Sequence, residues 1–561
     1  MYLRKRALRF SLVFLFLIVC LFLFSVQLVL IQVFRSSHLA DLAQQQQNHY
    51  VKLEPVRGTV FDRRMRPLAI NLSVQSLYAN PRQMSSQDKL LAVKKLSDML
   101  GLNSSYLENQ LGRKKYFVWL VRKLPMDLAE QIKKLDLKGL GFIKESKRYY
   151  PNQNLAAHLI GFAGVDNLGL EGLELAYDKD LRGEFGWMMI LRDARQQELM
   201  LDKGFIPPKD GFSLVLTIDE TIQYIAERAL EKAFKKHHAK SASIIVMDPR
   251  TGEILALANL PTYNLESYNE SRTEARTNRA VSYIYEPGSV FKIVPLTAAL
   301  EEQAVQETDK FFCENGEYRV ANHILHDHHS HGWLTFSEVI EQSSNIGTVK
   351  VAQKIGLETV YKYAKRFHFG ETTGIDVQGE VPGILKPPSK WSKTSIGAIP
   401  IGQEVAVTPL QLVSAISAIA NDGVYMRPFV VKYIKDSHDE LIKGTDPKAV
   451  DQVMSADTAR RVKAILQKVV EQGTGKLAQI KGVNVAGKTG TAQKPEGGGY
   501  SQSKFYATFF GFAPVENPRL AAVVVFDEPH PNHFGGTVSA PVFREVISDS
   551  LRYLNALDAG M

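Results

Sequence analysis

The chain opens with a long run of apolar residues. Residues 10–34 contain no charged side chain and are rich in Leu, Phe and Val. At about 1.5 Å per residue, a helix of this length crosses a hydrocarbon core of about 30 Å. The run therefore predicts a transmembrane helix, and because no second run of comparable length follows, we expect a single crossing.

The charges around this run predict its direction. Four basic residues lie within positions 1–9, whereas only Arg35 follows the run directly. Because positively charged flanks stay in the cytoplasm, residues 1–9 are expected inside and the rest of the chain outside, in the periplasm. A cleaved signal peptide is the alternative, but its apolar core is about 7–15 residues long and ends in small residues. The exit at residues 27–38 has no Ala-x-Ala, which favours a retained anchor.

The pattern of polar and apolar positions then divides the exported part. An extended segment is expected at residues 56–63, and short amphipathic helices are expected within residues 85–140. The glycines and paired prolines of residues 204–211 are typical of a boundary rather than of packed structure. We therefore expect two exported domains, residues 35–209 and residues 210–561.

The second domain alternates between strand-like and helix-like stretches. Residues 241–248 and 253–259 have the pattern of apolar strands joined by a turn at 249–252. Helices are expected at 289–303, 335–355, 408–421 and 456–471, strands at 483–493, 505–514 and 520–527, and a closing helix near 542–554. Strands at both ends of a helical middle predict an α+β fold, with one largely antiparallel sheet and a helical subdomain.

Composition narrows the possible functions. The net charge of +9 comes from 68 Lys and Arg scattered among 59 Asp and Glu. Because there is no arginine-rich block, nucleic acid is not an expected partner. Cys20 lies in the apolar run and Cys313 is the only other cysteine, which excludes a disulfide between two exported sites.

A histidine-rich stretch at residues 323–331 surrounds Asp327. It lies in a loop-like segment bounded by glycine and lacks the helical HExxH pattern of zinc hydrolases. A solvated loop is favoured over a metal site, so neither a metal nor a cofactor is predicted. The role of the stretch stays open.

Three short motifs carry the candidate chemistry, in the order Ser289-Val290-Phe291-Lys292, Ser343-Ser344-Asn345 and Lys488-Thr489-Gly490-Thr491. Each motif alone is weak, because similar letters occur at Ser86–Lys89, Ser501–Lys504, Ser267–Asn269 and Lys393–Ser395. The context selects the first set. Ser289 follows Glu286-Pro287-Gly288 and opens an apolar helix, while Lys488 lies in a strand. Ser343 lies on an expected helix that begins with a capping box at residues 335–338.

The first motif has the elements of an activated nucleophile. A serine hydroxyl needs a base, and at spacing i, i+3 on one helix Ser289 and Lys292 approach within hydrogen-bond reach. Lysine acts as a base only when its pKa is lowered, which burial and a second cation such as Lys488 would cause. A helix that begins at Ser289 also points backbone N–H groups at a developing oxyanion. Pro295 predicts a distortion of this helix, because it removes one hydrogen bond.

The other two motifs offer relay and binding groups. Ser343 has a hydroxyl that can pass on a proton, and Asn345 has an amide that can hold both the lysine and a substrate peptide group. Lys488, with the hydroxyls of Thr489 and Thr491, makes a cationic strand edge suited to a carboxylate. The glycines of this strand, Gly490 among them, let a peptide dock as an added strand.

Plainer interpretations stay open for some of these residues. Ser289 could be an ordinary helix N-cap, and Asn345 could be structural. Gly473-Thr474-Gly475 is expected to be a plain helix stop. Asp62 and Arg63 are expected to form a structural pair in a turn.

The three motifs behind an export anchor resemble the penicillin-recognising serine transferases. The resemblance to class B penicillin-binding proteins extends from residue 50 to residue 545. It includes Arg57-Gly58 with Asp62-Arg63, Tyr149–Pro151, Gly169–Gly172, Glu286–Ser289, Gly402-Gln403 with Thr408–Leu412, and Gly473–Gly475. It implies a penicillin-binding, serine β-lactamase-like transpeptidase domain at residues 210–561, preceded by an elongated α+β pedestal, or dimerisation, domain.

The resemblance also implies a reaction. Ser289 would be the acylated nucleophile and Lys292 its general base, with Ser343 and Asn345 as the proton-relay and substrate-binding pair. The enzyme would cross-link peptidoglycan stem peptides through an acyl-enzyme formed from D-Ala-D-Ala, with release of D-Ala. β-Lactam antibiotics would acylate the same serine.

The third motif would bind the substrate. Lys488 and Thr489 would receive the terminal carboxylate of the stem peptide, with Gly490 next to them in the strand. The backbone N–H groups of Ser289 and Thr491 would form the oxyanion hole.

The resemblance implies partners and a subtype as well. The pedestal lacks enzymatic activity, so glycan polymerisation would come from a polytopic SEDS-family polymerase, with other division proteins and a contact near residues 57–63. The chain length and the ending at residues 535–543 are most similar to the division-specific FtsI type, with elongation-specific relatives as the runner-up. A β-lactamase would be a short, freely secreted domain. A β-lactam sensor or a division scaffold with a vestigial acylation site is disfavoured by the intact motifs and by the single anchor without a cytoplasmic signalling domain.

Overall fold

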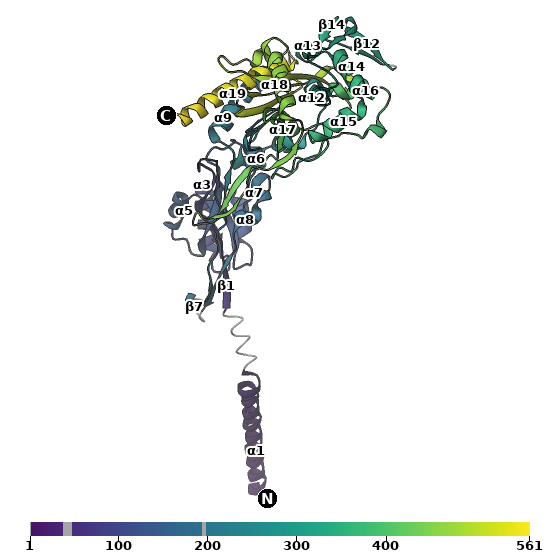
Figure 1. The fold of residues 1–561 in the computed structure, drawn as a ribbon. Helices are drawn as coiled ribbons and strands as arrows, with labels where there is room; N and C mark the ends of the chain where they lie inside the picture. Colours follow the sequence, from purple (N-terminus) through teal and green to yellow (C-terminus); the bar gives the residue numbers. More distant parts are fainter. Residues whose placement is uncertain (1, 37–47, 193–197, 322, 561) are drawn as a thin grey trace. The chain divides into compact units, whose positions relative to one another are not determined.

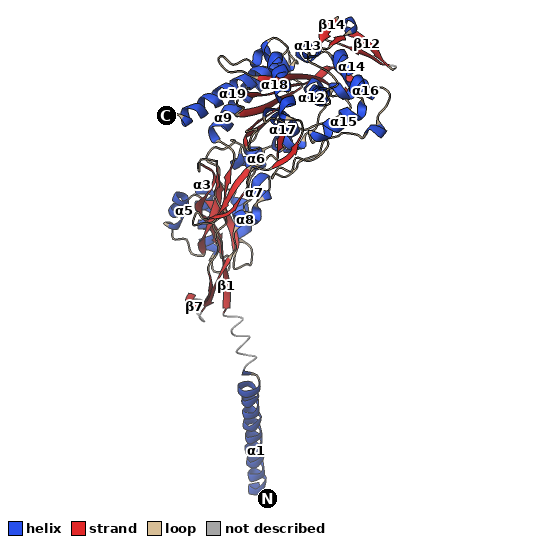
Figure 2. Cartoon of the chain, viewed as in Figure 1, coloured by secondary structure: helices blue, strands red, loops and turns tan. Residues whose placement is uncertain are grey.

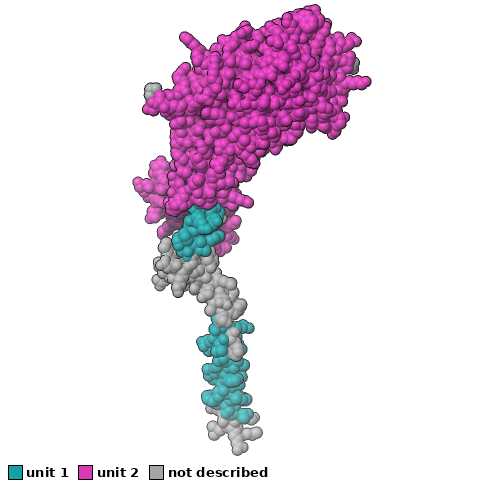
Figure 3. All heavy atoms as spheres, viewed as in Figure 1, with its two compact units in different colours: residues 1–56, 183–210 teal, residues 57–182, 211–561 magenta. Residues whose placement is uncertain are grey.

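The computed structural model describes residues 2–36, 48–192, 198–321 and 323–560. They form two compact units (Figure 3). One unit comprises residues 1–56 and 183–210, and the other comprises residues 57–182 and 211–561.

The first unit contains the long helix α1 (Tyr2–Val29), which continues as a π-helical turn, η1 (Leu30–Phe34) (Figure 1). Its segment Leu8–Val33 has a mean hydropathy of 3.0 and, among the described residues, is the one helix long and apolar enough to cross a membrane. The helix predicted at residues 10–34 is thereby confirmed. This unit also holds an antiparallel sheet of β1 (Asn48–Leu53), β6 (Gly186–Arg192) and β7 (Glu198–Ile206).

The second unit has a seven-stranded sheet in the order β17-β16-β8-β2-β3-β4, with β5 paired to β3. Its strands are β2 (Val60–Phe61), β3 (Pro67–Ala79), β4 (Val118–Leu124), β5 (Leu140–Tyr149), β8 (Ser213–Leu216), β16 (Val431–Lys435) and β17 (Leu441–Gly444). The sheet joins strands from both sides of residue 209. Residues 57–182 and 211–561 therefore pack as one unit.

The helices expected within residues 85–140 are present as α3 (Ser86–Leu100), α4 (Ser104–Leu111) and α5 (Met126–Lys133). Their buried residues form one apolar cluster with residues of β3 and β4. The strand β4, which lies between α4 and α5, was not predicted. Only three of its seven residues are buried, so its sequence shows little apolar alternation.

A buried ionic cluster lies beside this sheet. The Arg57 guanidinium is 1% exposed and donates to Glu174 Oε2 at 2.7 Å and to Asp178 at 2.7 Å. The predicted pairing of Asp62 with Arg63 is wrong. The Asp62 carboxylate instead accepts hydrogen bonds from the N–H and the guanidinium of Arg66 across the turn at residues 62–66, and Arg63 pairs with Glu253 at 3.0 Å.

The predicted antiparallel sheet is confirmed in the order β10-β9-β21-β20-β19. Its strands are β9 (Ser241–Met247), β10 (Ile254–Leu260), β19 (Ala486–Glu496), β20 (Gly499–Ala513) and β21 (Leu520–Asp527). Strands β9, β10 and β21 are buried at every residue. Such strands lack polar alternation because helices cover both faces of the sheet (Figure 2).

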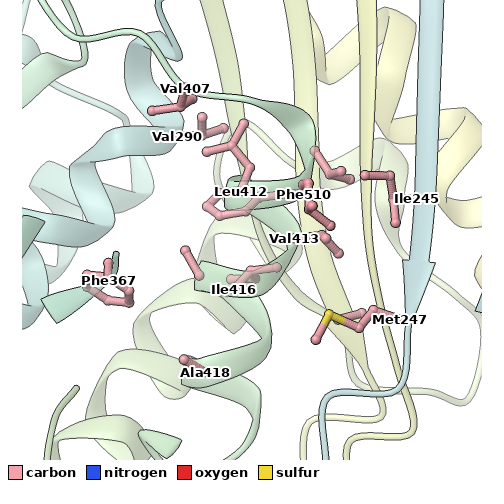
Figure 4. Packing of buried hydrophobic residues seen from close by; sticks show 14 of the residues in the cluster. Ile245, Met247, Val290, Phe367, Val407, Leu412, Val413, Ile416, Ala418 and Phe510 are labelled. Atoms are coloured by element: carbon pink, nitrogen blue, oxygen red, sulfur yellow. The ribbon is translucent and has the colours of Figure 1, made fainter. Parts of the chain in front are cut away.

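Alternate strand residues belong to two separate cores. Ile244, Val246 and their neighbours pack with helices α9 (Glu220–Lys236) and α19 (Gly535–Asp558). Ile245, Met247 and Phe510 pack on the opposite side with α17 (Pro409–Ala420), as Figure 4 shows. The central helix α17 is buried along its whole length, and a capping box at Thr408 begins it.

The helical middle consists mainly of α12 (Ile293–Glu301), α13 (Phe336–Glu341), α14 (Asn345–Ile355), α15 (Leu357–Arg366) and α18 (Ala456–Glu471). The predicted helices at 408–421 and 456–471 match α17 and α18. The single helix predicted over 335–355 is wrong, because the chain breaks between α13 and α14. The closing helix α19 begins at Gly535 and not near Val542, and it contains Pro541.

Shorter elements complete the fold. The short helices are α6 (Ala157–Ile160), α7 (Gly172–Ala176), α8 (Asp178–Arg182), α10 (Thr273–Arg276), α11 (Arg279–Ser282) and α16 (Ser395–Ala398). Three two-stranded ribbons pair β11 (Lys310–Phe312) with β14 (Trp333–Thr335), β12 (Glu317–Val320) with β13 (His323–His326), and β15 (Val424–Met426) with β18 (Ala449–Gln452).

Candidate active site

Ser289 lies in a 3₁₀ turn, η3 (Gly288–Lys292), that leads into α12. In a 3₁₀ turn the side chains at i and i+3 eclipse each other, so Ser289 and Lys292 lie on one side, as predicted from their spacing. The turn begins at Gly288, whose φ of +58° is left-handed and whose N–H donates to the Gly402 carbonyl at 3.1 Å. Pro295 falls in the first turn of α12, where a missing N–H leaves no helical bond broken.

Ser343 does not lie on a helix, contrary to the prediction. It follows the end of α13 and has a left-handed φ of +59°. Ser344 then caps α14 by accepting a hydrogen bond from the Gly347 N–H at 3.0 Å. This break between two helices directs Ser343 and Asn345 toward Lys292.

The ammonium group of Lys292 is fully buried and held by the second motif. Its Nζ donates to the Ser343 carbonyl at 2.6 Å, to Ser343 Oγ at 3.3 Å and to Asn345 Oδ1 at 2.8 Å. Burial lowers the pKa of Lys292 to about 7, although Asp327 acts in the opposite direction. At neutral pH this lysine is therefore partly deprotonated and able to act as a base.

Lys488 reaches the same serine from strand β19. Its Nζ is fully buried and donates to Ser343 Oγ at 2.8 Å and to the Thr489 carbonyl at 3.3 Å. Burial, and Lys292 next to it, hold the pKa of Lys488 well below its ordinary value. Because the two ammonium groups share one hydroxyl, each disfavours the charged form of the other.

The remaining residues of the third motif are held by neighbours outside it. Thr489 Oγ1 lies 2.7 Å from Thr474 Oγ1, so Thr474 is more than the plain helix stop that was expected. Thr491 Oγ1 accepts a hydrogen bond from the Gly535 N–H at 3.2 Å, at the start of α19. A Cβ at Gly490 would lie 2.9 Å from the Pro287 carbonyl oxygen, which explains the glycine there.

Asp327 is a site residue that the sequence did not reveal. Its carboxylate accepts hydrogen bonds from Ser344 Oγ at 2.6 Å, from the Asn345 N–H at 2.5 Å and from the Ile346 N–H at 3.1 Å. It therefore fixes the first turn of α14, and with it Asn345, to the segment after β13. The described part of the histidine-rich stretch has no group of three or more potential metal ligands.

A cleft of about 610 Å³ lies over these groups. Its lining includes Ser289, Asn345 and Thr491, with His328 and Phe534 in contact across it at 6.0 Å between ring centroids. The similar-looking motifs lie elsewhere: Ser86 is exposed on α3, and Ser501 Oγ accepts a hydrogen bond from the Lys504 N–H within β20.

Five of the predicted site residues lie close together, and the other three follow Lys488 along β19. Ser289, Lys292, Ser343, Asn345 and Lys488 converge, as expected from the three motifs. Lys292 donates to Ser343 and Asn345 and not to Ser289 in this geometry. Catalytic hydrogen bonds in proteins without substrate are often long, so this geometry does not argue against a direct transfer between Lys292 and Ser289.

Comparison with known proteins identifies the family. Residues 242–548 match the "Penicillin binding protein transpeptidase domain", and residues 52–216 match the "Penicillin-binding Protein dimerisation domain". The chain is 36% identical to the Bacillus subtilis "Stage V sporulation protein D", over 98% of this chain and 85% of that protein. It is 33% identical to the Escherichia coli "Peptidoglycan D,D-transpeptidase FtsI", over 89% of this chain and 84% of that protein.

A solved structure agrees with these sequence matches. Penicillin-binding protein 3 from Mycobacterium tuberculosis, in complex with aztreonam, has a TM-score of 0.71 and 27% identity. The match covers 90% of this chain and 97% of that one. Together with the three converging motifs, these findings show that the chain belongs to the penicillin-binding proteins, as a class B member with a transpeptidase domain and a dimerisation domain.

Proposed function

We propose that this protein is a peptidoglycan D,D-transpeptidase that cross-links stem peptides through an acyl-enzyme on Ser289. The observation that carries the proposal is the fully buried Lys292, whose pKa of about 7 makes it a base at neutral pH, one 3₁₀ turn from Ser289. The names of the relatives support the same substrate and reaction.

Acylation follows from this geometry. Lys292 Nζ takes the proton of Ser289, whose oxygen attacks the carbonyl carbon between the two D-alanines. The N–H groups of Ser289 and Thr491 stabilise the oxyanion. The bond to the leaving D-alanine breaks, and its nitrogen receives a proton through the hydroxyl of Ser343, which lies between Lys292 and Lys488.

Substrate binding uses the edge of β19. The terminal carboxylate of the stem peptide pairs with Lys488, whose charged form a neighbouring anion favours, and with the hydroxyl of Thr489. Asn345 donates to a substrate carbonyl. In the second half-reaction, the amine of a neighbouring stem peptide attacks the ester carbonyl, forms the cross-link and releases Ser289. β-Lactams acylate the same oxygen.

Labelling with a fluorescent penicillin tests the nucleophile. Ser289→Ala should abolish labelling of a protein that melts like the wild type, whereas Ser86→Ala and Ser501→Ala serve as matched controls and should label fully. Labelling that persists in Ser289→Ala would refute this choice of nucleophile. Rapid loss of the label from the wild type would instead favour a β-lactamase.

The cellular setting is part of the proposal. We place residues 1–9 in the cytoplasm and the transpeptidase domain outside the membrane, because the basic residues lie before the apolar helix. The domains are proposed at residues 35–209 and 210–561. The similarity to FtsI supports septal synthesis, in partnership with a SEDS-family glycan polymerase and other division proteins.

A role in sporulation is the second candidate setting for this enzyme. The relative named Stage V sporulation protein D is 36% identical over almost the whole chain, which supports a transpeptidase that acts during sporulation. Depletion during vegetative growth separates the two settings. Filaments would support the septal role, whereas normal division would favour the sporulation role and round cells an elongation role.

A further inference from the structure

A carboxylate lies in the cleft wall beside the nucleophile and has no part in the acylation steps. Glu286 lines the cleft together with Ser289, Gln403 and Tyr500. Its position is fixed by the preceding residue, because Tyr285 pairs in a β-bridge with Val407. A group bound at Glu286 would therefore lie in the same cleft as the acyl group on Ser289.

The two oxygens of Glu286 differ in their surroundings. Oε1 accepts hydrogen bonds from the Glu404 N–H at 3.0 Å and from the Tyr500 hydroxyl at 3.3 Å. Oε2 is buried and has no hydrogen-bond partner within the described chain. A buried carboxylate oxygen without a donor is costly in free energy, so Glu286 gains most from a ligand that brings donors and positive charge.

The protein itself does not supply that charge. Among the described residues, no lysine, arginine or histidine affects the pKa of Glu286, and Glu404 accepts a hydrogen bond from the Ser395 hydroxyl at 2.6 Å. Burial, together with the second carboxylate at Glu404, raises the pKa of Glu286. Glu286, a carboxylate in the wall of the cleft with a second carboxylate close by, attracts a cation.

The side chain of Tyr500, whose hydroxyl donates to Glu286, can move away at a low cost in free energy. Tyr500 lies at the start of β20, directly after the glycines of the β19–β20 turn. Gly497 and Gly498 have positive φ, and a Cβ at either would meet no atom within 4 Å. The Tyr500 hydroxyl can therefore leave Glu286 without a change in the packed part of the sheet.

We propose that Glu286 is the subsite for the acceptor ammonium, the group that becomes the amine attacking the Ser289 acyl-enzyme. This inference rests on the proposed transpeptidase function and names how its second substrate is held. An ammonium has three donors, so it can satisfy Oε2 and take the place of Tyr500 at Oε1. Its charge also offsets the repulsion between Glu286 and Glu404.

The ammonium gives one proton to the Glu286 carboxylate and becomes a neutral amine. Its nitrogen attacks the acyl carbonyl, a C–N bond forms, and the C–O bond to Ser289 breaks. The second proton passes from nitrogen to the serine oxygen through Lys292, and Glu286 releases its proton to solvent.

The test measures how the full-length protein divides an acyl-enzyme between hydrolysis and aminolysis. A thioester analogue of the D-Ala-D-Ala peptide forms the acyl-enzyme, and D-alanine amide serves as an acceptor with a cationic amine. Hydroxylamine, which is uncharged near neutral pH, serves as the neutral acceptor. Glu286→Gln removes the charge with little change of shape, and Glu358→Gln, exposed on α15, is the matched control.

We expect Glu286→Gln to acylate at a rate close to the wild type. Its half-saturating concentration of D-alanine amide should rise by about tenfold or more, because one charged hydrogen bond is lost. Its response to hydroxylamine should not change, and Glu358→Gln should match the wild type with both acceptors. Equal losses with both acceptors, or no loss with D-alanine amide, would overturn the subsite.

The wild type provides a second measurement that does not depend on a folded variant. Guanidinium carries charge and N–H donors without a nucleophilic nitrogen, so it should compete with D-alanine amide and leave hydrolysis unchanged, compared with the same concentration of sodium chloride. A lack of competition counts against the subsite. If the wild type forms no acyl-enzyme from the thioester, the proposed function fails, which separates the two outcomes.

Discussion

Asp327 holds the first turn of α14 in place. Its carboxylate accepts three hydrogen bonds from the first turn of α14, from Ser344 Oγ and from the backbone N–H groups of Asn345 and Ile346. Asn345 in turn accepts a hydrogen bond from Lys292 at 2.8 Å. Asp327→Ala would therefore release the turn that positions the base.

The size of the effect follows from these contacts. Hydrogen bonds to a charged group contribute about 1.5–3 kcal/mol each, and an anion at a helix N-terminus adds about 0.3–1 kcal/mol. In Asp327→Ala, water would replace part of the lost hydrogen bonds, because the turn is half-buried. We therefore expect the free energy that stabilises the first turn of α14 to fall by about 2–4 kcal/mol. If about 1.4–2.8 kcal/mol of the loss falls on the acylation transition state, acylation slows by about 10- to 100-fold.

The assay is the rate constant for labelling by a fluorescent penicillin, read together with the melting temperature. Asp327→Asn keeps an acceptor for the N–H groups, so it should lose less activity than Asp327→Ala. The matched control is Asp436→Ala, because Asp436 accepts from the His438 and Glu440 N–H groups in a surface turn far along the chain. Wild-type labelling and melting by Asp327→Ala would refute the idea that this carboxylate holds the turn.

Three further predictions concern the base, the third motif and the buried ionic cluster. Only neutral Lys292 accepts a proton and its pKa is about 7, so the acylation rate should fall with decreasing pH, by about tenfold per unit below pH 6; a flat acid profile would exclude this base. Gly490→Ala places a Cβ 2.9 Å from the Pro287 carbonyl oxygen and should cost about 1–3 kcal/mol in chemical denaturation, whereas Gly499→Ala, which meets no atom within 4 Å, should cost little. Arg57→Ala removes one of the two arginines that pair with the buried Glu174 and leaves Arg148 on it at 2.6 Å, so it should cost about 2–4 kcal/mol in the same assay; a loss below 1 kcal/mol would contradict the structure.

Local patterns predicted much of the fold. The helices at 408–421 and 456–471 begin with N-caps; the first is apolar throughout and the second has a periodic apolar face, and the buried strands of the second sheet are continuous apolar runs. Strand β4 was missed because its residues are mostly half-buried, so its alternation is weak. Patterns of burial are visible in a sequence only when burial is complete or strictly periodic.

The break at Ser343 shows the limit of such patterns. Residues 335–355 have the capping box and apolar spacing of one helix, yet Ser343 adopts a left-handed conformation between two helices. The strain is offset by contacts from distant segments, from Lys292, Lys488 and Asp327. No window of neighbouring residues contains that information.

The sequence by itself determined the anchor, the three motifs, their order and the family resemblance, because these depend on residue type and spacing. Only the tertiary structure decided whether Lys292 can act as a base, because its pKa depends on complete burial and on groups far away in the chain. It also brought Asp327, Thr474 and Glu286 to the site. Their roles rest on contacts through space, which spacing along a chain does not encode.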